Sequence, residues 1–512
     1  MLKALSTVGG FTMMSRVLGL VREIFMAAFL GTGVVTDAFY AALRLPNMFR
    51  RIFGEGAFNS AFVPLFGREL AEGHVEEAHR FARNAFAWLG GVLLVATIIL
   101  IPAMPWFARL LVPLADAETY ELVVAYGRIM FSYLLCMALS AHLSGVLNTV
   151  GVFSMPAFAP VLLNVLMLTV LAVIVPLAHW QGELALIGTA VSWSVCAAGF
   201  AQLALLWISC WRKGIRIYPV RPHLTPRIRR LLILMGPGVM AAGIQQINLV
   251  VGTAIASSQK SAIGSLNYAD RLFQMPNGMI GAAFGVVLLP EITRLLRSGN
   301  EPAANDAIGR GVLLSMLITL PAMIAFVVAP QAFVGPIYER LEFTPEDTRL
   351  VSQALAAFAV GLPAYVLVKV LQAGYFARED TKGPMKIAIV TVSVNAAASL
   401  ILFRYIGFVG IAVATSIAGW VNVLLLVKGL RGRLGLGPER RGKLLRTFLA
   451  ASAMGGVVWL AHQGLGDWFA GLQWQRIVAM LAVVAAGMVS FGMLAIGLKA
   501  TSVAELRAGF RR

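Results

Sequence analysis

The sequence predicts an all-α membrane protein that crosses the bilayer many times. Of its 512 residues, 59% are hydrophobic and only 13% are charged, which is about half the roughly 25% charged share of a typical soluble domain. The apolar residues gather in blocks of about 20 or more, the length that a helix needs to cross roughly 30 Å of hydrocarbon. These observations exclude a soluble enzyme, a secreted disulfide scaffold and a disordered chain.

The apolar blocks predict about fourteen transmembrane helices. Six precede a basic linker at 211–230, six follow it, and two come after a second basic linker at 428–446. In chain order the predicted spans are 6–30, 36–65, 84–106, 121–147, 155–178, 184–210, 232–257, 265–292, 311–334, 350–376, 384–403, 407–428, 447–463 and 475–498.

Matched short motifs divide the chain into two similar halves and an appended pair of helices. The motif Gly188-Thr-Ala-Val191 recurs as Gly410-Ile-Ala-Val413, and two further pairs, Ala57-Phe58…Pro64 with Ala283-Phe284…Pro290 and Gly145…Pro156 with Gly374…Pro384, follow at nearly the same offset. Because each half has six spans, both halves start on the same side of the membrane, which predicts parallel repeats. We therefore expect a six-helix lobe at 1–215, a second at 216–430, and two extra helices with a tail at 431–512.

The distribution of basic residues predicts the orientation. If the N-terminus is inside, 28 of the 42 Lys and Arg residues lie in inside segments and six in outside loops. Cytoplasmic loops are rich in Lys and Arg, so both termini are expected in the cytoplasm. The net charge of +18 then reflects membrane topology and anionic lipid rather than nucleic acid. Three cysteines without CxxC spacing and six scattered histidines predict neither a disulfide nor a metal site.

Charged side chains lie where the first two spans should be apolar. The first span contains Ser15, Arg16, Arg22 and Glu23, and the second contains Asp37, Arg44, Asn47, Arg50, Arg51 and Glu55. A central arginine costs about 2.5–3.5 kcal/mol on insertion scales, so these side chains should face water, a partner or a ligand. Arginines outnumber carboxylates here, and the guanidinium fork suits phosphate. The pattern therefore predicts an anionic, phosphate-bearing ligand.

The eighth span resembles the second. It contributes Asp270, Arg271 and Gln274, and both spans carry Pro-Asn, at Pro46-Asn47 and Pro276-Asn277. Proline bends a helix and frees backbone carbonyls. Bends at matched positions are what a gate at a central cavity needs.

Other interpretations of these residues stay open. Arg50 and Arg51 could anchor a shorter span at the inner leaflet, and Arg44 could snorkel outward. Asp37 could cap the second span, and Asp270-Arg271 could form a local ion pair at a helix end.

Catalytic and nucleotide-binding motifs are absent from the sequence. It contains no G-x-x-x-x-G-K-[ST], no H-E-x-x-H and no nucleophile elbow, so neither a nucleotide motor nor an enzyme is expected. We expect no cofactor. Transport would instead draw on a coupling cation, the membrane potential or the gradient of the substrate itself.

The runs SRVLGLVRE, TDAFYAALRLPNMFRRIFGEGAFNSAFVP and YADRLFQMPNGMIGAAFGVVLLP resemble the MurJ (MviN) lipid II flippases of the multidrug/oligosaccharidyl-lipid/polysaccharide (MOP) exporter superfamily. The resemblance covers essentially the whole chain. It implies two MATE-like lobes in the bacterial cytoplasmic (inner) membrane. It also implies that the last two spans form a groove for the lipid tail.

The resemblance implies a function and a binding site. Such proteins move the undecaprenyl-pyrophosphate-linked peptidoglycan precursor lipid II from the inner to the outer leaflet by alternating access. The substrate-binding residues of the family correspond here to Arg16, Arg22, Arg50, Arg271 and Asp37. Gating or supporting roles fall on Ser15, Glu23, Asn47, Arg51, Glu55, Asp270 and Gln274. Lipid II and membrane lipids are the expected partners, nucleic acid is not, and the chain is expected to act as a monomer.

The sequence differs from the family pattern in two places, and two other functions stay open. Gln274 stands where some members have glutamate, and spans 232–257 and 384–403 contain no Asp or Glu, so a carboxylate sodium site is not supported. A flippase for another polyprenyl-pyrophosphate glycan would share the same phosphate chemistry. A cation or drug antiporter of the same superfamily would need acidic rather than basic cavity residues.

Overall fold

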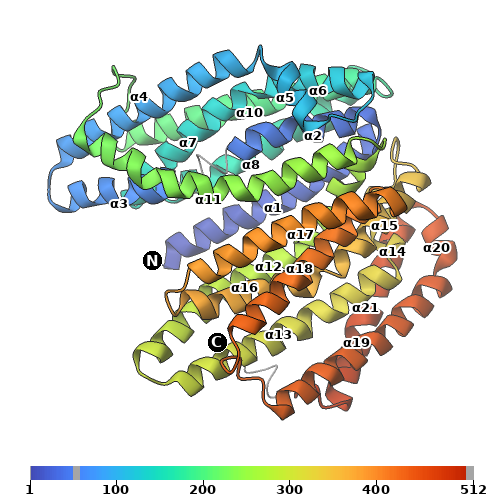
Figure 1. Ribbon diagram of the computed structural model, residues 1–512. Coiled ribbons are helices and arrows are strands. Elements are labelled where there is room, and N and C mark those ends of the chain that lie inside the picture. The colour runs from blue at the N-terminus through green and yellow to red at the C-terminus, as the bar shows by residue number, and fades with distance from the viewer. Residues whose placement is uncertain (1, 50–57, 503–512) are drawn as a thin grey trace. The chain divides into compact units, whose positions relative to one another are not determined.

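The computed structural model describes residues 2–49 and 58–502; within them, the side chains of 2–6, 60, 237–242, 244–245, 247–248 and 278–287 are not described. The regular structure of the described residues is helical (Figure 1), as the composition predicts. The helices form two compact units. The first comprises 1–264 and 340–343, and the second comprises 265–339 and 344–512.

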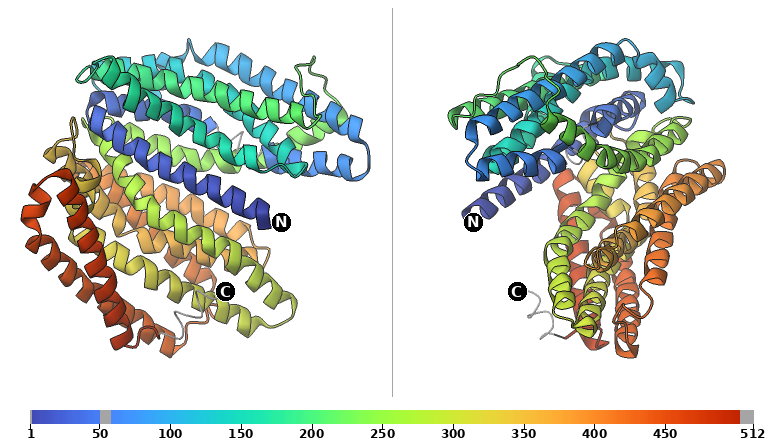
Figure 2. Two further views of the ribbon diagram at one scale, coloured as in Figure 1. Left: turned by 180° about the vertical axis from the view of Figure 1, so that it is seen from behind. Right: turned by 60° about the vertical axis from the view of Figure 1, so that its left-hand side comes forward.

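The first unit is a bundle of long and short helices. They are α1 (Leu2–Leu30), α2 (Val34–Phe49), α3 (Phe58–Ala71), α4 (Val75–Leu100), α5 (Met104–Leu111), α6 (Ala117–Met130), α7 (Ser132–Thr149), α8 (Ser154–Thr169), the π-helical turn η2 (Val170–Ile174), α9 (Val175–Leu177), α10 (Leu184–Arg212) and α11 (Pro226–Ala256). Helix α1 packs on α8, and α2 packs on α6. Helix α10 contacts α6, α7 and α8, and another face of it carries exposed side chains such as Trp193 and Phe200. The helices of this unit run from blue to green in Figure 2.

The second unit has the same all-helical construction. Its helices are α12 (Ala262–Arg297, whose first residues belong to the first unit), α13 (Glu301–Val328), α14 (Gln331–Tyr338), α15 (Pro345–Ala359), α16 (Leu362–Phe376), α17 (Lys382–Ile406), α18 (Val409–Gly429), α19 (Pro438–Gly464), α20 (Gly466–Ala470) and α21 (Gln473–Gly497). Its main core contains fully buried side chains such as Ile292, Ile308, Val370 and Leu426. The final helices pack on this core through contacts of α19 with α13.

The compact units group some helices in another way than the expected lobes do, and the lobe boundaries stay a prediction. Within the predicted span 36–65, the described residues form α2, which packs on α6, and α3, which packs on α7. Helix α11, expected in the second lobe, packs on α3, α4 and α5 and groups with the first unit. The last two long helices are part of the second unit rather than a separate body. Such groupings reflect long-range packing, which hydropathy does not report.

Similar helix contacts recur in the two units, in support of the predicted duplication. Helix α7 packs on α10 in the first unit, and α16 packs on α18 in the second. A glycine permits the close approach in both pairs. A Cβ atom at Gly199 would lie 2.8 Å from the Tyr133 side chain, and one at Gly419 would lie 3.3 Å from Tyr365.

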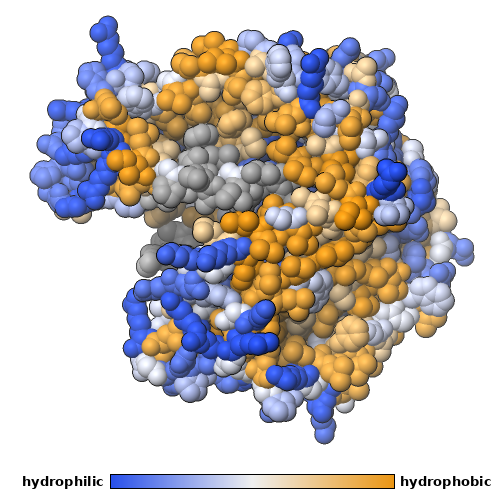
Figure 3. Space-filling view, in the orientation of Figure 1, coloured by the Kyte–Doolittle hydropathy of each residue, from blue (hydrophilic) through white to orange (hydrophobic). Residues whose placement is uncertain are grey.

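Among the described residues, ten helical segments are long and apolar enough to span a membrane by length and composition. They correspond to the third to sixth and the ninth to fourteenth predicted spans. Their outward faces carry large apolar side chains, for example Ile98, Leu400 and Met488, and hydrophobic residues cover wide areas of the surface (Figure 3). The chain is therefore a multi-pass membrane protein.

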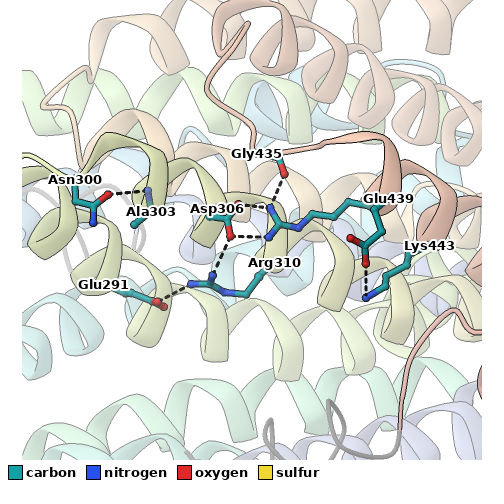
Figure 4. Close-up of polar contacts among 9 residues, drawn as sticks. Glu291, Asn300, Ala303, Asp306, Arg310, Gly435, Glu439 and Lys443 are labelled. Carbon is teal, nitrogen blue, oxygen red and sulfur yellow. Dashed lines mark hydrogen bonds and ion pairs between the residues drawn. The ribbon is translucent and has the colours of Figure 1, made fainter.

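A chain of ion pairs attaches the second basic linker to α13 (Figure 4). Arg440 donates two hydrogen bonds of 2.7 Å to the Asp306 carboxylate and a third, 2.5 Å long, to the backbone oxygen of Gly435. Arg310 lies 3.5 Å from Asp306 and 3.0 Å from Glu291 on α12. Gly435 has a φ of +56°, and a Cβ there would lie 2.3 Å from a backbone oxygen, so glycine is required.

Candidate functional site

The charged residues of the first span lie in very different environments along α1. Arg16 is exposed and Ser15 is half-buried. Arg22 is only 8% exposed and Glu23 only 1%, although they lie less than two turns further along the helix. Helix α8 packs against α1 and covers this part of it. The same motif therefore provides one accessible cation and one buried ion pair.

The buried pair belongs to a hydrogen-bonded network within the first unit. Arg22 Nη2 donates to Glu23 Oε1 at 2.5 Å, and the Tyr40 hydroxyl of α2 donates to Glu23 Oε2, also at 2.5 Å. Arg22 Nη1 donates to Asn164 Oδ1 of α8 at 2.9 Å, and Asn164 Nδ2 donates to the Ser15 backbone oxygen at 3.0 Å. The network thus joins α1, α2 and α8.

Burial makes this network energetically sensitive. A charge removed from water is tolerated only when a partner and further hydrogen bonds compensate for lost solvation. Glu23 receives two such bonds. Arg22 has a carboxylate and an amide oxygen as acceptors, while its buried Nε has no hydrogen-bond partner within the described part of the chain. Arg22 is therefore paired within the first unit in this structure, and its contact with the substrate stays a prediction.

Asp37 is buried, and its carboxylate contacts the start of α12. It is 4% exposed, and its Oδ1 accepts a 2.6 Å hydrogen bond from the backbone N–H of Gly264, in the first turn of α12. Its carboxylate thus satisfies a donor that the helix itself leaves unpaired. The capping interaction considered from the sequence occurs at the start of α12 rather than of α2.

Arg44 connects α2 to α11 through hydrogen bonds instead of extending toward the membrane surface. Its guanidinium donates to the Thr253 hydroxyl and, at 3.3 Å, to the Leu249 backbone oxygen. Asn47 is half-buried one turn further along α2. Arg50, Arg51 and Glu55 lie outside the described residues.

A second group of polar side chains lies on α12 and α16 of the second unit. Arg271 and Gln274 are exposed, Asp270 is half-buried, and the Gln274 amide donates to the Asp270 carboxylate. Lys369 Nζ lies 3.1 Å from Asn277 Oδ1 and 3.4 Å from its backbone oxygen. Lys369 of α16 therefore contacts the Pro-Asn motif of α12.

The sequence-based reasoning missed Tyr40 and Asn164. Both are uncharged, and Asn164 is 142 positions away from Arg22. One local signal was present, because Asn164 is the single amide in the otherwise apolar run VLLNVLML. A polar residue inside such a span is a candidate for an interhelical hydrogen bond.

These features define the class: a multi-pass, all-helical membrane transporter with cationic residues in its first helix. Residues 26–479 match the family model described as lipid II flippase MurJ. Two relatives are the probable lipid II flippase MurJ of Rhizobium meliloti (strain 1021), 41% identical over 100% of this chain and 96% of its own, and the lipid II flippase MurJ of Burkholderia cenocepacia, 33% identical over 97% and 96%. The chain belongs to the MurJ lipid II flippase family.

Solved structures agree with this assignment at the level of the fold. A lipid II flippase MurJ in an inward closed conformation superposes with a TM-score of 0.78 at 24% identity, covering 96% of this chain and 98% of its own. An inward-facing MATE multidrug resistance transporter of the MOP superfamily gives 0.67 at 14% identity, covering 87% and 98%. The predicted family, the MATE-like fold and a transporter rather than an enzyme are confirmed.

Proposed function

We propose that this protein moves lipid II from the inner to the outer leaflet of the bacterial cytoplasmic membrane by alternating access. The observation that carries the proposal is the family match over residues 26–479. The arginine-bearing first helix supports it, because the substrate is held through an anionic pyrophosphate.

Arg16 is the side chain best placed for a first contact with the pyrophosphate. It is exposed, whereas Arg22, less than two turns further along α1, is buried. Two parallel hydrogen bonds from one guanidinium suit a phosphate group. Arg22 would join only if the anion replaced Glu23 as its partner. We therefore assign Arg22 to a later step than Arg16, in which the rearranged ion pair helps the protein to change conformation.

The second unit contributes its own polar face to the proposed cycle. The exposed Arg271 provides a second cation, and the Asp270–Gln274 hydrogen bond braces the helix turn that carries it. The Lys369–Asn277 contact fixes α16 against the Pro276 position of α12. Contributions of Arg50, Arg51 and Glu55 from the first half belong to the same proposal.

An apolar pocket in the second unit suits the polyprenyl tail. It has a volume of about 430 Å³ and lies among α13, α16, α18 and α19, with Met316, Leu371 and Trp420 in its walls. The second linker closes one side through Leu434 and Leu436. Burial of apolar surface stabilises a bound chain by about 25 cal/mol per Å². Residues of the second linker and of α19 line this pocket, which supports a part for them in a groove for the lipid tail.

Orientation, assembly and energy supply complete the proposal. Both termini face the cytoplasm, in line with the 28 to 6 bias of basic residues. One chain is the functional unit. A coupling cation or the membrane potential returns the empty, positively charged protein to its inward-facing state.

The test is lipid II exposure on the outer leaflet of cells depleted of their own flippase and expressing this chain. We expect the wild type to restore exposure and Arg16→Ala and Arg22→Ala to reduce it strongly. Arg349→Ala is the matched control, since its exposed ion pair with Glu346 lies at the start of α15. Wild-type protein that inserts but restores nothing would refute the lipid II assignment. Normal exposure with both α1 variants would refute the arginine mechanism.

A further inference from the structure

The first basic linker is attached to α4 by a reciprocal pair of hydrogen bonds. Asn84 Nδ2 donates to the backbone oxygen of His223 at 2.7 Å, and the backbone N–H of His223 donates to Asn84 Oδ1 at 2.9 Å. Trp88 Nε1 adds a 3.1 Å bond to the same oxygen. The linker, the irregular green segment beside α4 in Figure 1, is thereby held in one position along the helix.

Between α4 and this linker lies a pocket of about 600 Å³, called here the linker pocket. Its lining includes four arginines but only one carboxylate, that of Glu77. The volume falls within the usual range for a small-molecule site, about 300–1,000 Å³. Its arginines are Arg80, Arg83, Arg221 and Arg227.

Two of the four arginines are fixed in the walls. Arg83 donates to Glu76 at 2.9 Å and to the Tyr218 hydroxyl at 3.1 Å, and its guanidinium lies over the Tyr218 ring. Arg227 binds Glu69 at 3.0 Å and Glu77 at 2.5 Å. These contacts neutralise the acidic side chains around the pocket.

The guanidinium groups of the other two arginines are available to a ligand. Arg80 and Arg221 are exposed, and the guanidinium groups of both are without a hydrogen bond or ion pair to any residue that the structure describes. An arginine fork offers paired donors that match the oxygens of a phosphate. The pocket therefore combines a fixed wall with two available phosphate-binding groups.

The pocket lies at the level of the lipid headgroups. In α11, the exposed apolar side chains begin at Leu232, about 9 Å along the helix from Pro226 in the pocket wall. In α4, Trp88 lies one turn beyond Asn84 and precedes the exposed Val92 and Val95. Tryptophan marks the membrane–water interface. Hydrophilic residues gather at this end of the first unit (upper left in Figure 3).

We propose that the linker pocket binds the phosphate of an anionic phospholipid headgroup, with Arg80 and Arg221 as its direct contacts. None of the described residues assigned above to substrate binding lines this pocket. A soluble phosphate has the same charge chemistry, but only a lipid also places its acyl chains along the apolar faces of α4 and α11.

The test uses the full-length, delipidated protein in detergent and native mass spectrometry. Phosphatidylglycerol, phosphatidylcholine and inorganic phosphate are titrated separately. We compare wild type with Arg80→Gln/Arg221→Gln and with Arg229→Gln/Arg230→Gln. The latter removes the same charge from exposed positions of α11 outside the pocket.

We expect phosphatidylglycerol to bind wild type and the control with affinities within twofold, and the pocket variant about 10- to 30-fold more weakly, as for two lost arginine contacts. Phosphatidylcholine should bind more weakly than phosphatidylglycerol. Equal weakening in both variants, or none in either, would overturn the proposal. Inorganic phosphate binding as tightly as phosphatidylglycerol would overturn the lipid as the ligand. Thermal unfolding without lipid verifies that all three proteins are folded.

Discussion

Asn164 Oδ1 accepts a 2.9 Å hydrogen bond from Arg22 Nη1, so a neutral side chain of α8 fixes the orientation of an arginine on α1. The Asn164 amide also lies over Gly19, where a Cβ would stand 3.8 Å from its polar atoms. Asn164 Nδ2 donates to the Ser15 backbone oxygen. Asn164 is thus a positioning residue for the cationic first helix.

Replacing Asn164 should separate positioning from charge. Asn164→Leu introduces an apolar side chain of similar size, so Arg22 loses a hydrogen-bond acceptor. Loss of a hydrogen bond to a charged group should lower the free energy of unfolding by about 1.5–3 kcal/mol, and lipid II exposure should fall. Asn164→Asp keeps an acceptor for Arg22 and should retain more activity. The control is Asn148→Leu at an exposed position of α7. Equal loss in the Leu and Asp variants would argue against a positioning role.

Removing one partner of the Arg22–Glu23 pair should lower protein stability more than replacing both partners. Glu23→Ala leaves a buried guanidinium without its carboxylate, and we expect the free energy of unfolding to fall by about 3–5 kcal/mol. Arg22→Met/Glu23→Met removes both charges and should unfold at a higher temperature than Glu23→Ala. Thermal unfolding in detergent measures the difference, with the exposed Glu121→Ala as control. A double variant less stable than the single one would contradict this account.

The Asp37–Gly264 hydrogen bond should protect the start of α12. Asp37→Ala removes the buried acceptor of the Gly264 N–H, so hydrogen exchange at this amide should accelerate. Asp37→Asn retains an oxygen and should have a smaller effect. Asp467→Ala, at an exposed carboxylate of α20, is the comparison. Unchanged exchange at Gly264 in Asp37→Ala would show that the bond does not hold this turn.

The Arg440–Asp306 interaction should be modest in strength but specific in geometry. Asp306 is half exposed, so solvent screens the pair and we expect Asp306→Ala to cost about 0.5–1 kcal/mol. Exchanging the charges in Asp306→Arg/Arg440→Asp should recover part of this loss. The measured quantity is the unfolding temperature. An exchanged variant less stable than Asp306→Ala would indicate that the Gly435 backbone contact matters more than the ion pair.

Asp116 lies outside the membrane-spanning segments and makes a pH-dependent contribution to protein stability. Its carboxylate caps α6 through a 2.9 Å bond from the Thr119 N–H and lies 3.3 Å from Lys260. The Thr119 hydrogen bonds, and then Lys260, lower the pKa of Asp116 below its ordinary value of 3.8. The stabilisation is therefore fully present above about pH 4 and is lost as the pH falls through the lowered pKa. Asp116→Asn should flatten this part of the stability profile, whereas Asp467→Asn should not.

Much of the architecture could be predicted from the sequence because hydropathy is a local property. A run of about 20 apolar residues must form a helix in lipid, where every backbone polar group needs a partner within the segment. The helices, the duplicated halves and the arginine-bearing first span follow from such local patterns. The exposed Arg16 and the half-buried Ser15 also lie on the helix that the sequence predicts for them.

The sequence by itself determined an all-helical membrane protein whose first helix contains arginines. The tertiary structure alone decided which charges are available. Arg16 and Arg22 are identical residues in one motif, yet packing of α8 and α2 gives Arg22 the partners Asn164, Glu23 and Tyr40 and leaves Arg16 exposed. Contacts between residues 142 positions apart arise only after folding, so no local pattern can distinguish the accessible arginine from the buried one.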